Sequence, residues 1–144
     1  MVRRRCALAF IASVMSAGCG DAPAQQVEDA WVRSAPPSAA VLAGYFTLRN
    51  RADRAVTIVD AHSDAFGRIE IHETFTRDGT TGMRRIEGLE VAAGDSVVLA
   101  PGGRHLMLMH PDRPLAPGDR LEIVLELDDG TDVAFPAEVR RAAP

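Results

Sequence analysis

Short stretches rich in Val, Ile, Leu, Tyr and Phe recur along this chain and are separated by turn-forming residues. Several stretches alternate apolar and polar side chains, as in RLEIVLEL at 120–127, and a period of two is typical of a β-strand with one buried face. LDDGTD at 127–132, PGG at 101–103 and APGD at 116–119 predict turns between such strands. The candidate strands lie at 27–34, 41–50, 55–63, 67–74, 83–91, 96–103, 105–109, 120–127 and 132–139.

The region after residue 24 contains no long amphipathic helix pattern, and APPSAA at 35–40 reads as a loop. About 120 residues are enough for one domain with one modest core. No internal repeat or linker divides this region. The chain is therefore predicted to be all-β and to form a single β-sandwich domain.

The first 24 residues have the features of an export signal. Three arginines at 3–5 precede the apolar run CALAFIASVMSAG, which is too short to span a bilayer as a mature anchor. Two cleavage positions fit. SAGC resembles a lipobox, with Ser16 where leucine is usual, and would make Cys19 the lipidated first residue of a lipoprotein anchored to the inner or outer membrane. APA ending at Ala24 would instead suit an ordinary signal peptidase.

Residues 1–24 are thus predicted to be a signal peptide or lipoprotein signal, cleaved before Cys19 or after Ala24. Residues 25–144 are predicted to be the folded domain, exported to the periplasm. Both cysteines, Cys6 and Cys19, lie in or at the end of the signal region, so the domain has no thiol and no disulfide. A blue-copper electron carrier needs a Cys thiolate ligand, so this class is excluded.

Charge limits the partners of the domain. All sixteen basic residues are arginines, and the formal net charge of −4 becomes more negative once the arginines of the signal are removed. Binding to nucleic acid phosphates needs a basic surface. Nucleic acid is therefore not expected as a partner.

The stretch RHLMLMH, at 104–110, concentrates metal-binding side chains in a chain that has only five Met and four His. In a strand, His105, Met107 and Met109 would lie on one face, and the two leucines and His110 on the other. An isolated strand of this kind is more often a core strand in which methionine fills space. The rest of the chain has to distinguish the two interpretations.

Two more candidate ligands favour a binding site. His72 closes the predicted strand GRIEIHET and Met83 follows the turn RDGTTG, which gives the spacing His-X10-Met-X21-His-X-Met with His105 and Met107. Thioether sulfur binds Cu(I) well and is a poor ligand for zinc or hard cations, whereas imidazole suits both oxidation states of copper. These donors predict a copper site that prefers Cu(I). Binding of Cu(II) in some states of the protein stays open as an alternative. Met109 is expected to pack beneath the ligands.

The His/Met spacing resembles that of the periplasmic copper chaperone PCu(A)C family. The similarity to that family extends along nearly the whole predicted domain. It includes the phrases VEDAWVR, AGYFTLRN, IEIHE, LAPGGRHLMLM and RPLAPGD. The resemblance implies a cupredoxin-like, Ig-like β-sandwich that binds one Cu(I) through His72, Met83, His105 and Met107. It also implies delivery of copper to the copper-bearing subunit of a respiratory cytochrome oxidase, at Cu(A) or another site, alongside a Sco-type thiol protein. The end of the chain, AEVRRAAP, lacks the His- and Met-rich tail of some relatives, so one site is expected.

Other classes of function fit the sequence less well than a copper carrier. Ser96 in GDSVV lacks the flanking glycines of a nucleophile elbow, and Asp128 and Asp129 lie in a predicted hairpin turn, so an enzyme is not expected. A binding module without a metal would leave the His/Met spacing unexplained. Copper storage or detoxification would use the same ligands as a carrier and stays open as an alternative.

Overall fold

The computed structural model describes residues 22–141, so Cys19 and most of the predicted signal segment lie outside the described residues. The described chain is built from strands, and in it no helix is long and apolar enough to cross a membrane. This confirms the predicted all-β fold. The strands are β1 (Gln25–Arg33), β2 (Val41–Asn50), β3 (Val56–His62), β4 (Phe66–Arg77), β5 (Thr80–Ile86), β6 (Leu89–Val91), β7 (Ser96–Leu99), β8 (Arg104–Pro111), β9 (Arg120–Leu127) and β10 (Asp132–Arg140).

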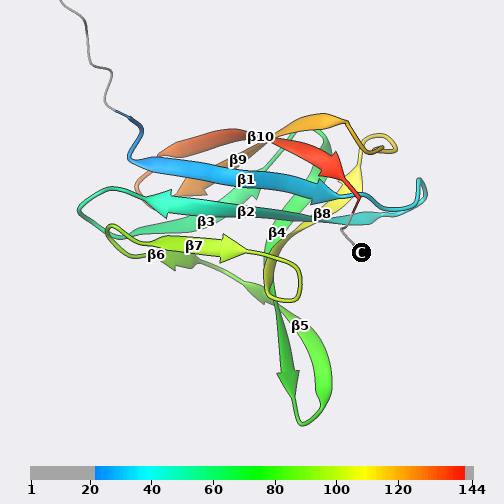
Figure 1. Ribbon diagram of the computed structural model, residues 1–144, viewed down its shortest axis with the longest axis horizontal. Helices are drawn as coiled ribbons and strands as arrows, with labels where there is room; N and C mark the ends of the chain where they lie inside the picture. Colours follow the sequence, from blue (N-terminus) through cyan, green and yellow to red (C-terminus); the bar gives the residue numbers. More distant parts are fainter. Residues whose placement is uncertain (1–21, 142–144) are drawn as a thin grey trace, which may run out of the picture.

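The strands follow one hydrogen-bonded path that folds back on itself into a sandwich (Figure 1). Their order is β5-β4-β8-β2-β1-β10-β9-β3-β6, and β7 pairs with β2 beyond the end of the β2–β8 ladder. The pairing of β1 with β10 is parallel and joins the two layers, whereas the other pairings are antiparallel. β8 therefore lies between β4 and β2, in the middle of its layer.

Apolar and polar side chains alternate along β8 and β9, and the apolar ones fill the space between the layers. On β8, Leu106 and Leu108 are fully buried, and on β9 the same is true of Leu125. Each fully buried leucine contributes about 1.5–3 kcal/mol relative to an exposed one. The inward side chains of these strands stabilise the sandwich, and the outward side chains can contact a ligand or solvent.

The predicted strand at 83–91 is wrong in one respect, because the structure divides it into β5 and β6. The chain leaves the sheet between Ile86 and Leu89, and the two strands pair at opposite ends of the strand order, β5 with β4 and β6 with β3. Gly88 allows the crossing, since a Cβ there would lie 3.3 Å from the Cγ2 methyl of Thr57. Leu89 on the short β6 is buried. Its apolar character is one reason why the sequence pattern predicted a single strand across 83–91.

The hairpin of β4 and β5 projects from the sandwich (Figure 1). Ile69 and Ile71 on β4 are buried, whereas the strand is exposed from Phe75 onward. Asp78 and Gly79 close the hairpin with φ values of 51° and 74°, in the left-handed region that a tight turn requires. Residues on β5 are thus presented beyond the core.

The far end of β2 is closed by Asn50, a polar residue with 1% exposure. Its side-chain amide donates to the backbone carbonyls of Arg54, Val91 and Ala92. Because these bonds satisfy a buried polar group, they fix the loops at this end of the sandwich.

Candidate metal centre

The register of β4 and β8 places His72 directly opposite His105. The centroids of the two imidazole rings are 6.1 Å apart, with an angle of 36° between the ring planes. Met107 is opposite Glu70 on β4 and Ala43 on β2. Residues opposite one another in an antiparallel pair share a face, so these side chains lie together on the outer face of the layer, away from the core.

Met83 joins this face from the projecting hairpin. It is opposite Thr74, two residues beyond His72 on β4, and its side chain is 61% exposed. Met83, His105 and Met107 line one open groove of about 420 Å³. The remainder of the groove is formed by Arg33, Ser34, Ala35, Pro36, Val41, Leu42 and Ala43. The structure thus brings three of the predicted ligands into one groove, and the His72 ring lies 6.1 Å from that of His105, centroid to centroid.

Hydrogen bonds orient both imidazoles. His105 Nδ1 lies 3.1 Å from the carbonyl oxygen of Gly103, which can only accept, so Nδ1 donates. His72 Nε2 lies 2.8 Å from Glu70 Oε2, and donates to this carboxylate. Metal-binding histidines typically donate one ring N–H to a carbonyl or carboxylate, which leaves the lone pair of the other nitrogen for the metal. His105 Nε2 and His72 Nδ1 are the nitrogens left in this way.

Glu70 is the residue of this site that the sequence prediction missed. It is 12% exposed and forms ion pairs with Arg68 and, at 3.5 Å, Arg85. Its hydrogen bond with His72 lowers the pKa of the carboxyl below its ordinary value; Arg68 and Arg85 also lower it, against the opposing effect of burial. Glu70 is therefore ionised at neutral pH and able to accept from His72. Its position two residues before His72, on the same strand face, was the available signal.

The other histidines and the third methionine of the domain are outside the groove. Met109 shares the outer face with Met107, opposite Arg68 and Val41, and is partly exposed. A regular strand would put His110 on the same face as the two leucines, but His110 is exposed and has a φ of 55°. This left-handed backbone interrupts the alternation at the end of β8.

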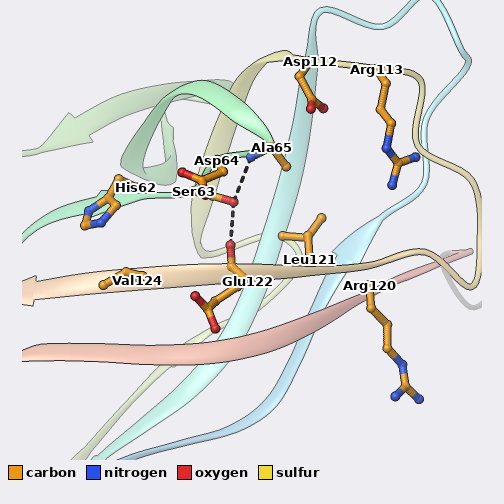
Figure 2. Close-up of a pocket in the computed structure, with 10 residues that line it drawn as sticks. All are labelled: His62, Ser63, Asp64, Ala65, Asp112, Arg113, Arg120, Leu121, Glu122 and Val124. Carbon is orange, nitrogen blue, oxygen red and sulfur yellow. Dashed lines mark hydrogen bonds between the residues drawn. The ribbon is translucent and has the colours of Figure 1, made fainter.

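His62 lies in a separate groove of about 510 Å³ between the β3–β4 turn and β9 (Figure 2). Ser63 fastens this turn, because its hydroxyl donates to the carbonyl of Glu122 and accepts from the N–H of Ala65. None of the predicted ligands lines this groove. Between residues 22 and 141, no three side chains of His, Cys, Asp or Glu are grouped so that they could hold a metal ion.

Comparison with known sequences identifies relatives over nearly the whole described chain. The family model "Putative lipoprotein LpqE-like" matches residues 26–139. "Putative lipoprotein Lxx21020" of Leifsonia xyli subsp. xyli is 33% identical over 136 residues, which cover 92% of this chain and 80% of that protein. "Uncharacterized protein RP573" of Rickettsia prowazekii is 34% identical over 101 residues, 69% of this chain and 56% of that longer protein.

Solved structures share the fold. The copper-bound PCuAC domain from PmoF2 has a TM-score of 0.70 at 21% identity and covers 83% of this chain and 94% of that domain. The CuI form of DR1885 from Deinococcus radiodurans has a TM-score of 0.65 at 30% identity and covers 90% of this chain and 86% of that one. The resemblance to PCu(A)C domains is therefore confirmed, and the chain belongs to the LpqE-like family.

Proposed function

We propose that this protein is a copper chaperone that binds one Cu(I) through His72, Met83, His105 and Met107. The observation that carries the proposal is the groove shared by Met83, His105 and Met107, with the ring centroid of His72 6.1 Å from that of His105. Two thioethers and two neutral imidazoles form an uncharged, soft donor set that favours Cu(I). The names of two structural neighbours support it, since one is a copper-bound PCuAC domain and the other is called CuI-DR1885.

The hydrogen bonds of the two histidines support specific ligating atoms. With Nδ1 of His105 donating to Gly103 and Nε2 of His72 donating to Glu70, copper would bind His105 Nε2 and His72 Nδ1. The ionised carboxylate of Glu70 also makes the His72 ring a better electron donor. His72 is thus the most firmly held ligand of the proposed site.

The exposure of Met83 suggests how copper leaves. Met83 is 61% exposed on the projecting hairpin, whereas the side chains of His72 and Glu70 are only 15% and 12% exposed. A sulfur ligand of the recipient can approach from the Met83 side and replace the Met83 thioether first. The step is a ligand exchange in which one Cu–S bond forms, one breaks, and copper stays Cu(I).

The proposed recipient is the copper-bearing subunit of a respiratory cytochrome oxidase, with a Sco-type thiol protein as a cooperating partner. This part of the proposal rests on the resemblance to the PCu(A)C family. Export follows from the predicted signal at 1–24, and the lipoprotein description of the family supports cleavage before Cys19. Mass spectrometry of the protein from the periplasmic and membrane fractions distinguishes a lipidated Cys19 from an unmodified chain that starts after Ala24.

An anaerobic Cu(I) titration of the mature protein, in competition with a chromophoric chelator, tests the proposed function. We expect saturation at one Cu(I) per chain and no displacement of Cu(I) by an equal concentration of Zn(II). Tight binding of two or more Cu(I) ions would favour storage. A tighter affinity for zinc than for copper would contradict the soft donor set.

A further inference from the structure

The three methionines between residues 22 and 141 differ in their access to solvent. Met83 is 61% exposed, whereas Met107 and Met109 are only partly exposed. Both of the latter lie on β8, which has β4 on one side and β2 on the other. Met83 lies on β5, and in the described part of the chain β5 pairs with β4 alone. Met83 is therefore the methionine that a small solute reaches most easily.

Met83 also lies outside the hydrophobic core. Its strand belongs to the hairpin that projects from the sandwich (Figure 1). Oxidation of a buried methionine to the sulfoxide puts a polar group into the core and disrupts its packing. A sulfoxide at Met83 would face solvent, so the fold tolerates this change. Because Met83 lines the same groove as His105 and Met107, the change would still reach the proposed metal site.

The predicted domain has no thiol that could react with an oxidant first. Both cysteines, Cys6 and Cys19, precede residue 25, so residues 25–144 contain none. Cysteine and methionine are the side chains whose oxidation cells reverse enzymatically. The reversible redox groups of this domain are thus thioethers, and Met83 is the most exposed of them.

We propose that Met83 is a reversible oxidation site, at which a hydroperoxide converts the thioether to a sulfoxide and closes the empty metal site. The sulfur lone pair attacks the terminal peroxide oxygen, the O–O bond breaks, and the proton of the attacked oxygen moves to the leaving oxygen. Sulfur loses two electrons, the peroxide gains them, and water or an alcohol leaves. A methionine sulfoxide reductase would restore the thioether.

The effect on copper rests on the proposed function. A sulfoxide presents a hard oxygen where the thioether presented a soft sulfur, so the site would lose one of its four donors for Cu(I). Copper and the oxidant also compete for the same sulfur lone pair. A loaded site is therefore protected from oxidation, whereas an empty site is open to it.

Peptide mass spectrometry of the mature apo protein, treated briefly with hydrogen peroxide and stopped with catalase, tests the oxidation site. Trypsin cleaves after arginine and releases Met83 as the single methionine of DGTTGMR at 78–84. Met107 and Met109 share the peptide that begins at His105, and fragmentation separates them. We expect Met83 to oxidise on the order of tenfold faster than the other two, because it is the most exposed. Equal rates at Met83 and Met107 would overturn the proposed site.

The same treatment of Ag(I)-loaded protein tests protection by a metal. Ag(I) is a soft monovalent ion like Cu(I), and it does not produce radicals from peroxide. One equivalent should slow the oxidation of Met83 about tenfold, because a bound lone pair cannot attack the peroxide. Met109 is the internal control, since it is not a proposed ligand, and its rate should stay the same. An unchanged rate at Met83 would overturn the coupling between metal binding and oxidation.

A Cu(I) titration of the oxidised protein measures the closing of the site. The affinity should fall about 100-fold, to the level of untreated Met83→Leu, and return after treatment with reductases for both sulfoxide epimers. Thermal melts of the apo protein should coincide before and after oxidation, which excludes unfolding as the cause. Peroxide-treated Met83→Leu is the matched control, because it should lose no further affinity. A further loss in this variant would assign the effect to another methionine and overturn the proposal.

Two outcomes separate the oxidation site from the proposed function. If the untreated protein binds one Cu(I) and oxidation of Met83 leaves that affinity unchanged, the closing of the site is overturned and the copper chaperone stands. If the untreated protein fails to bind Cu(I), the proposed function is overturned. Selective and reversible oxidation of Met83 in that protein would still support the oxidation site.

Discussion

The two faces of β8 differ in what their side chains contact. Leu106 and Leu108 point inward and are fully buried, whereas His105 and Met107 alternate with them on the outer face and line the groove. The inward row contributes to folding through apolar burial, and the outward row offers ligands. The comparison teaches that the core fixes the geometry of the proposed ligands, so we expect the apo protein to be folded and copper only to add stability. Small zinc domains are different, because metal binding drives their folding.

The largest expected effect comes from the inward face. Leu108→Ala should lower the free energy of unfolding of the apo protein by about 2–5 kcal/mol, because it leaves a cavity among fully buried side chains. Chemical denaturation followed by circular dichroism measures this loss. A loss of Cu(I) affinity in the folded variant, with little change in stability, would show that the two faces are not separate.

Met107→Leu tests the outward face with a change that conserves volume. The free energy of unfolding should change by less than about 1.5 kcal/mol. The Cu(I) affinity should fall on the order of 100-fold, or about 2.7 kcal/mol, since one soft donor is lost. Competition with a chromophoric chelator measures it, and Met109→Leu is the matched control. His105→Ala and His62→Ala form a second pair, and similar losses in all four variants would mean that the site is elsewhere.

Much of this division could be predicted from sequence because it depends on local periodicity. The alternation of RHLMLMH predicted which of the two leucines and two methionines share a face, and the His/Met spacing predicted ligands that the structure brings near one another. Pairing between distant strands is not encoded locally. The place of Arg33 opposite Ala43 and the bond from His72 to Glu70 became visible only with the register of β1, β2 and β4.

Two local features were also beyond the sequence pattern. The segment 83–91 has an apolar content typical of one strand, and nothing in that content shows that its two halves pair at different ends of the strand order. His110 continues the alternation in the sequence, but its backbone turns to a positive φ where β8 ends. Periodicity predicts faces only as long as the strand stays regular.

Glu70→Gln tests the outer face of β4, the strand next to β8. The amide keeps the size of the side chain but removes the charge that holds the N–H of His72, so Cu(I) affinity should fall about tenfold while the apo protein stays folded. Glu73→Gln is the control on the opposite face of the same strand, where the carboxylate pairs with Arg84. The role of Glu70 would be refuted if both variants bind Cu(I) as tightly as the wild type.

Acid should weaken the sandwich through carboxylates far from the proposed ligands. The N–H of Thr131 donates to Asp129 and, with Arg54, holds the pKa of this carboxyl below its ordinary value. A lowered folded pKa stabilises the protein above the unfolded pKa, near 4, and the stability is lost as pH falls toward the folded value. As pH falls below 4, the melting temperature of apo Asp129→Asn should therefore decrease slightly less than that of the wild type. Identical pH profiles of the two proteins would contradict this assignment.

X-ray absorption spectroscopy of the Cu(I)-loaded protein tests the central claim most directly, because it counts sulfur and nitrogen neighbours of the metal. The proposed site predicts two sulfur and two nitrogen ligands in the wild type, and the loss of one sulfur in Met107→Leu with no change in Met109→Leu. A copper shell of nitrogen and oxygen alone, or a sulfur count that Met107→Leu leaves unchanged, would contradict the assignment of the outer face of β8 to the metal.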